Sequence, residues 1–96
     1  MKRQNSVTMR EALSMWIDSM KLRQQIDEKR LIMLWKPTVG DYMAAKTKEI
    51  YIKNRTLFVY VDSSVVRNEL VLAKALLLKR LNSETGGSVI DDIIFR

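Results

Sequence analysis

The hydrophobic positions at the start of the chain repeat with the period of a helix. Thr8 and Glu11 have the spacing of a capping box, which marks the point where such a helix begins. The pattern predicts a helix over residues 8–20 with one apolar face, formed by Met9, Leu13, Trp16, Ile17 and Met20. A tryptophan on an apolar helical stripe is usually buried, so we expect Trp16 in the core.

A second helical pattern follows over residues 22–35, beginning at Leu22 or Gln24. Its expected apolar face is Leu22, Ile26, Met33 and Leu34, backed by Leu31 and Ile32. Pro37 has no backbone N–H to donate and disfavours helix at the residue before it, so the pattern ends there. Gly40 is a natural stop, and Asp41 is placed to cap a short helical turn over residues 42–45.

The hydrophobic period then changes from 3.6 to 2, which predicts a β-hairpin. The two strands are residues 49–53 and 57–61, and the turn between them contains Asn54, which tolerates positive φ. The expected core face is Ile50, Ile52, Leu57, Val59 and Val61, and the opposite face carries Tyr51, Phe58 and Tyr60.

A long helix is predicted over residues 64–81, with cap candidates in Asp62-Ser63-Ser64, and a last strand over residues 89–95. The order is therefore α-α-β-β-α-β. We expect an α+β fold in which a three-stranded mixed sheet has helices packed on one face, with a right-handed crossover into the last strand. Residues 1–96 form a single domain in this interpretation, with residues 1–6 disordered.

The composition argues against most catalytic chemistry. The 96 residues contain no cysteine and no histidine, which removes thiolate nucleophiles, the commonest metal ligands and the commonest general base. Asp91 and Asp92 are adjacent in a predicted strand, so they point to opposite faces and do not converge. Gly86-Gly87 lacks the Gly-Lys-Ser/Thr of a phosphate loop. We therefore expect that this protein is not an enzyme and that it binds no metal, cofactor or small-molecule substrate.

The apolar runs and the charge of the chain indicate where it acts and on what. The longest apolar runs are far shorter than a membrane span, and nothing at the start resembles a secretory signal, so we expect a cytoplasmic protein without membrane contact. The net charge of +6 and the pI near 9.8 favour a polyanionic partner.

Basic side chains near the hairpin suggest a nucleic-acid surface, because cations beside exposed aromatic rings suit single-stranded DNA or RNA. The candidates are Lys46, Lys48, Lys53 and Arg55. The alternative is an ordinary solvated surface whose tyrosines are covered by a helix. Trp35, beside the Pro37 break, and its neighbour Lys36 are candidates for contact with a protein partner.

Trp35, Val39 and Gly40 form a short motif around the Pro37 break. This motif resembles the W-x-x-V-V-G signature of the DciA-type family of bacterial replicative-helicase loaders. The resemblance continues through Thr47, Leu57-Phe58-Val59, Ser63-Ser64, Glu69-Leu70, Leu81-Asn82 and the segment 89–96. It implies a compact fold similar to K-homology (KH) domains. It also implies a role in DNA replication, without ATP, in which the protein binds the DnaB-type helicase and assists its loading on single-stranded DNA.

The chain departs from the family pattern at several positions. Thr38 replaces a usually apolar residue, Val66 replaces a frequent tryptophan, and no G-x-x-G loop is present for KH-style clamping of nucleotides. Two other functions stay open. The first is a stand-alone module that binds single-stranded DNA or RNA and has no helicase partner. The second is an interaction domain that docks an acidic peptide.

Overall fold

The computed structural model describes residues 7–96, so the expected disorder of residues 1–6 lies outside the described part. Its first element, α1, is one continuous helix over Met9–Met33 rather than the two helices expected. The reason is local: residues 20–24 contain neither glycine nor proline, so nothing interrupts the backbone bonds there. The predicted capping box is confirmed, with the Glu11 amide donating to Thr8 Oγ1 and the Thr8 amide to Glu11 Oε1, both at 3.0 Å.

Two short helices connect α1 to the sheet. α2 spans Trp35–Val39 and α3 spans Asp41–Ala45, so the predicted helical turn is confirmed. Asp41 does not cap it, because Asp41 is its first helical residue and Gly40 takes the cap position. Gly40 lies between them at φ 92° and ψ 165°, a backbone conformation that essentially only glycine adopts. The chain therefore turns sharply at this residue.

The sheet contains the predicted hairpin. β1 (Thr47–Lys53) pairs antiparallel with β2 (Thr56–Val61). The turn between them places both Asn54 (φ 51°) and Arg55 (φ 59°) at positive φ, which matches the right-handed twist of the strands. β3 (Asp92–Phe95) lies parallel to β2 on its other side and completes a mixed sheet in the order β1-β2-β3.

The helical region between β2 and β3 is divided in two. α4 spans Ser64–Leu72, and Ser63 caps it by accepting a hydrogen bond from the Val66 amide. α5 spans Lys74–Ser83. The backbone leaves helical geometry at Ala73 (φ −92°, ψ 5°), where no residue type marks a break. The predicted α+β class, the α-α-β-β-α-β order and the mixed sheet are confirmed.

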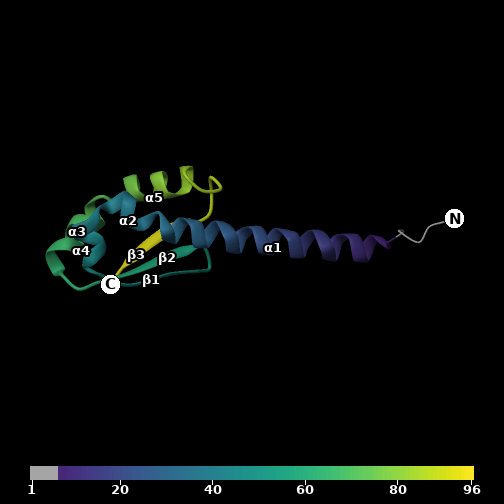
Figure 1. Ribbon diagram of the computed structural model, residues 1–96, viewed down its shortest axis with the longest axis horizontal. Helices are drawn as coiled ribbons and strands as arrows, with labels where there is room; N and C mark the ends of the chain where they lie inside the picture. Colours follow the sequence, from purple (N-terminus) through teal and green to yellow (C-terminus); the bar gives the residue numbers. More distant parts are fainter. Residues whose placement is uncertain (1–6) are drawn as a thin grey trace.

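Helices from both halves of the chain pack on one face of the sheet (Figure 1). Leu31 at the end of α1 and Trp35 in α2 enter this core from one side. The sheet contributes Leu57, Val59, Val61 and Ile93, the later helices contribute Val66, Leu70, Leu77 and Leu81, and the loop before β3 contributes Val89 and Ile90.

The first two-thirds of α1 lie outside this core. Every residue from 7 to 26 is exposed, and the molecule measures 68 × 20 × 20 Å because this helix projects from the body (Figure 1). The prediction that Trp16 is buried is wrong: 60 % of it is exposed. The expected apolar face of residues 22–35 is wrong at Leu22, Ile26 and Met33, which are exposed. The other members are confirmed, because Leu31 is buried in the core and Ile32 and Leu34 pack against it. No helix within residues 7–96 is long and apolar enough to cross a membrane.

Candidate nucleic-acid and partner interfaces

Three aromatic rings form a stack on the face of the sheet that points away from the core. Alternation along the strands brings Tyr51, Phe58 and Tyr60 to this face, because their neighbours Leu57 and Val59 point inward. Tyr51 and Phe58 are paired across the hairpin, with ring centroids 5.1 Å apart and planes 17° from parallel. Tyr60 lies 6.2 Å from Tyr51 at 21°. We call these three residues the sheet aromatics.

The sheet aromatics are partly covered by one another and not by a helix. Each is half-buried, and none belongs to the residues that pack against the core. Arg96, directly after β3, adds a cation: its guanidinium carbon lies 5.4 Å from the Phe58 ring centroid. Within residues 7–96 no helix covers the tyrosines, so that alternative is wrong. The rings offer flat, polarisable surfaces beside a positive charge.

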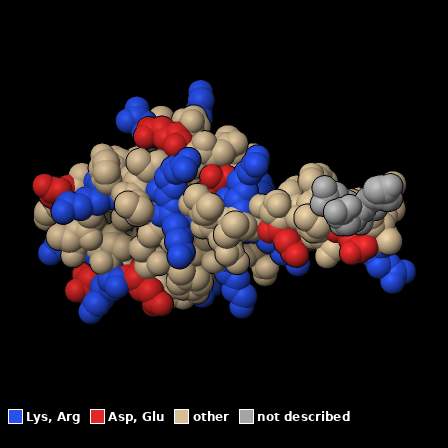
Figure 2. Space-filling model, turned by 45° about the vertical axis from the view of Figure 1, so that its right-hand side comes forward, with Lys and Arg blue, Asp and Glu red and all other residues tan. Residues whose placement is uncertain are grey.

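The four basic residues predicted from the sequence do not form one cluster. Lys46 and Lys48 lie at the end of the hairpin where β1 begins, and Lys53 and Arg55 lie at its turn. At the rise of a β-strand these two ends are roughly 20 Å apart, with the sheet aromatics between them. Figure 2 likewise shows the basic side chains of one face in several separate groups, with acidic side chains among them.

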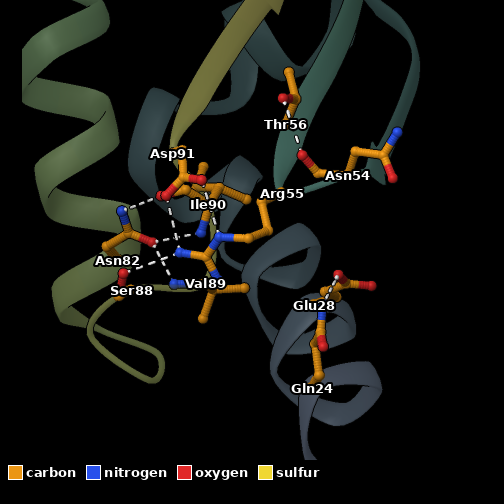
Figure 3. Close-up of polar contacts among 10 residues, drawn as sticks. All are labelled: Gln24, Glu28, Asn54, Arg55, Thr56, Asn82, Ser88, Val89, Ile90 and Asp91. Atoms are coloured by element: carbon orange, nitrogen blue, oxygen red, sulfur yellow. Dashed lines mark hydrogen bonds and ion pairs between the residues drawn. The ribbon is translucent and has the colours of Figure 1, made fainter. Parts of the chain in front are cut away.

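Lys48 and Lys53 are exposed, whereas Arg55 is occupied by contacts inside the molecule. Its Nε and one terminal nitrogen donate to the two carboxylate oxygens of Asp91, both at 2.9 Å, and the same terminal nitrogen donates to Ser88 Oγ at 3.0 Å (Figure 3). These charge-assisted bonds lower the pKa of Asp91 and raise that of Arg55. The Asp91 amide also donates to the Arg55 carbonyl at 2.7 Å. Arg55 thus ties the hairpin turn to the chain that enters β3.

Asp91 and Asp92 engage different partners, as expected for adjacent residues in an extended chain. Asp92 accepts a bond from Lys74 of α5 at 2.7 Å, and this contact together with the Ile93 amide lowers its pKa. Each carboxylate is therefore paired with a separate cation, and the two do not form a joint site.

Trp35, a predicted partner residue, is only 3 % exposed. Its indole nitrogen donates to Thr47 Oγ1 at 3.0 Å, and that hydroxyl donates to the Met43 carbonyl at 3.1 Å. The centroid of the Phe95 ring lies 6.4 Å from that of the indole. This tryptophan consequently joins α2, α3 and the sheet inside the core, and a partner cannot reach it without local unfolding.

Lys36, the other predicted partner residue, remains accessible. Its ammonium lies 3.9 Å from Asp41 in an ion pair whose two side chains are 70 % and 92 % exposed, so solvent screens it strongly. Tyr42, next along the chain, is 66 % exposed, and the Lys46 ammonium lies 5.7 Å from its ring centroid. Sequence reasoning missed both Tyr42 and Arg96. Arg96 could have been predicted from alternation, because it lies two residues after Ile94 and therefore on the same face of the sheet. No pattern in the sequence predicted that Tyr42 is exposed.

The residues that carry the family resemblance have structural roles in the fold. Trp35 anchors the core and Gly40 turns the chain, as described above. Asn82 holds the loop before β3: its Nδ2 donates to the Ile90 carbonyl at 2.8 Å, and its Oδ1 accepts from the Val89 and Ile90 amides at 2.9 and 3.0 Å (Figure 3). The residues that carry the resemblance therefore identify a fold more directly than a binding surface.

Comparison with known proteins agrees with the resemblance. The family model described as "Dna[CI] antecedent, DciA" matches residues 8–95, which is almost the whole chain. No curated protein and no solved structure matches the chain.

Proposed function

Since the chain belongs to the DciA family, we propose that it is a non-enzymatic accessory protein of bacterial DNA replication that binds the DnaB-type helicase and assists its loading on DNA. The observation that carries the proposal is the extent of the family match, which runs from the cap of α1 to the last strand. Loading in this form needs two non-covalent contacts, one with the helicase and one with the exposed DNA strand.

For the DNA contact we propose the sheet aromatics together with Lys48, Lys53 and Arg96. Stacking of a base on an aromatic ring is worth about 1–3 kcal/mol and tolerates any sequence, as a loader requires. The exposed lysines at either end of the ring stack would attract the backbone of the strand. Lys46, near the same end as Lys48, belongs to this surface as well. Arg55 does not, because Asp91 already neutralises its charge.

For the helicase contact we propose the surface of α2 and α3 around Lys36 and Tyr42. An exposed tyrosine is a residue type enriched at the centre of protein interfaces, and lysines beside it suit the polar rim of such an interface. The two proposed surfaces meet at Lys46, whose ammonium lies 5.7 Å from the Tyr42 ring centroid. Trp35 supports the surface of α2 and α3 from below by fixing α2 to Thr47.

Two variants separate the two contacts. Replacing both Tyr51 and Tyr60 by Ala is expected to weaken binding of a fluorescent single-stranded oligonucleotide by at least about tenfold, as judged from the stacking energy, and to leave helicase binding intact. The reciprocal variant, K36E with Y42A, is expected to lose purified helicase and keep the oligonucleotide. Neither variant removes a core side chain, and a thermal melt checks that both remain folded.

The main alternative is a stand-alone module for single-stranded DNA or RNA, which the stacked rings on an open sheet face also favour. Binding of purified helicase and of the oligonucleotide by the wild-type chain and by the double tyrosine variant discriminates between these functions. If the wild-type chain binds the oligonucleotide and fails to bind purified helicase, the loader proposal is refuted and the stand-alone function stands. If the chain binds helicase while the double tyrosine variant keeps full affinity for DNA, the sheet aromatics are not the DNA surface.

A further inference from the structure

The projecting part of α1 carries an apolar stripe that nothing else in residues 7–96 covers. Five residues form it, and their exposed fractions are 76 % for Met9, 50 % for Leu13, 60 % for Trp16, 44 % for Ile17 and 52 % for Met20. We call them the α1 stripe. On the face that Figure 2 shows, uncharged side chains separate the charged groups of this projection. A helix of this length is marginal in water without packing, and such an apolar patch marks an interaction site.

The stripe is continuous with the face of α1 that packs on the body. Met20, Asp27 and Leu31 follow at steps of seven and four residues, so they lie on one side of the helix. Leu31 is fully buried, and the Asp27 carboxylate is close enough to Gly86 that a Cβ there would lie 2.9 Å from Oδ2. An open cleft lies between residues 17–27 of α1 and the 86–89 loop, so the body does not cover this part of the face.

We infer that the α1 stripe is the interface of a homodimer in which two α1 helices pair antiparallel. Met9, Leu13, Trp16 and Met20 are separated by four, three and four residues, the spacing of alternating core positions in a coiled coil. When the helices run in opposite directions, Leu13 lies level with Trp16 of the second copy. In the same register Met9 lies level with Met20 of the second copy. Every contact is thus repeated by symmetry, as a two-fold interface requires.

The dimensions of the molecule leave room for a second copy. The helix starts at Met9 and every residue up to Ile26 is exposed, so the uncovered length is about 26 Å. In the antiparallel pair the start of one helix lies level with Met20 of the other. The paired stretch therefore fits within the uncovered length, and residues 21–26 of each copy keep the two bodies apart.

Side-chain size and charge agree with this pairing. Ala12 and Ser19 flank the stripe on one side, and their small side chains allow the two helix axes to approach closely. Residues 9–21 contain two basic side chains, Arg10 and Lys21, and two acidic ones, Glu11 and Asp18. The segment is consequently neutral, which opposes neither self-association nor close packing and gives a strongly charged partner no advantage.

The area of the stripe sets the expected affinity. Covering these five side chains on both copies buries on the order of 1,000 Å² in total, near the lower limit for a specific interface. The dimer should therefore form reversibly in the micromolar range rather than as an obligate unit.

Sedimentation velocity of the full chain across concentrations tests the inference. We expect a monomer–dimer equilibrium in which the dimer is the main species at about 200 μM. The variant with L13E and W16E is expected to stay monomeric at every concentration. The matched control is M15E, since Met15 is 61 % exposed on the opposite side of the same helix. This control should dimerise like the wild type. A wild-type chain that is monomeric at every concentration, or an L13E/W16E chain that still dimerises, would overturn the inference.

Cysteine crosslinking tests the register, because the chain has no cysteine of its own. Mixing M9C chains with tagged M20C chains under oxidising conditions should give the mixed disulfide, since these positions are level in the antiparallel pair. M9C alone should not crosslink, because the two cysteines would lie about 16 Å apart along the axis. Crosslinking of M9C to itself in preference to M20C would contradict the antiparallel arrangement.

Another occupant gives a different result. If the chain is monomeric at all concentrations and the L13E/W16E variant loses binding to purified helicase, the stripe is a helicase contact and the homodimer is refuted. If the dimer forms as expected, its loss in L13E/W16E leaves oligonucleotide binding through the sheet aromatics unchanged at concentrations where both chains are monomeric.

Discussion

Replacing Asn82 by Ala should destabilise the domain more than any other change of a polar side chain in α5. The Asn82 amide makes three hydrogen bonds to the backbone of Val89 and Ile90, with lengths of 2.8, 2.9 and 3.0 Å. Val89 is 6 % exposed and Ile90 is 1 % exposed, so the backbone groups released by the substitution have restricted access to water. The loop they belong to leads directly into β3.

The size of the effect follows from these contacts. A buried backbone group left without a partner costs about 1–3 kcal/mol, and partial access to water reduces the sum for the three groups to about 2–4 kcal/mol. That is a large part of the 5–15 kcal/mol by which a domain of this kind is stable, at order of magnitude. For a chain near 100 residues it corresponds to a melting temperature lower by roughly 10–25 °C.

Urea unfolding followed by circular dichroism measures the free energy of unfolding of N82A against wild type. The matched control is S83A, because Ser83 is the next residue, is exposed, and donates one bond to the Arg80 carbonyl at 3.0 Å. We expect the control to change stability by less than about 0.5 kcal/mol. A loss of less than about 1 kcal/mol in N82A with an unchanged denaturant slope would refute the reasoning, because the loop would then satisfy its own backbone groups.

Three further substitutions test other parts of the fold. G40A should lower the free energy of unfolding in urea by about 1–3 kcal/mol. Backbone strain is the whole cause, because φ is 92° and no atom lies within 4 Å of the added Cβ. An unchanged urea midpoint would contradict this explanation. W35F should lose about 1–2 kcal/mol of stability through the cavity and the lost bond to Thr47. Its folded form should still bind helicase in a pull-down, and loss of binding by folded W35F would return Trp35 to the interface. The pKa of Asp91 is lowered from 3.8 by Arg55, so the stability from this pair is complete above that value and is lost as pH falls through the lowered native pKa. Unfolding midpoints measured from pH 7 to 3 should therefore fall less steeply in D91N than in wild type, and identical acid limbs would refute the contribution.

Much of the candidate DNA surface could be predicted from alternation along the strands. The period of two placed the sheet aromatics on one face, opposite Leu57 and Val59, and the structure agrees. The position of Arg55 could not be predicted in this way. Its partner Asp91 is 36 residues away in sequence, and a residue at the tip of a hairpin has no alternation to show where its side chain points.

The two tryptophans show the same limit more sharply. The helical pattern predicts a buried Trp16, but 60 % of this residue is exposed. The position of Trp35 beside the Pro37 break suggests an accessible side chain, but only 3 % of it is exposed. An apolar stripe shows that a helix face needs cover. It does not show whether the cover is another part of the same chain or a different molecule.

Four local features of the fold could be predicted from short stretches of the chain: the cap at Thr8, the turn at Asn54, the end of a helix at Gly40 and the strands of the hairpin. These features depend on backbone preference and on side-chain spacing within a few residues. Which surfaces remain free could not be predicted in this way. Burial depends on contacts between residues far apart in the chain, so the free α1 stripe and the open face of the sheet appeared only once the helices had packed on the other side.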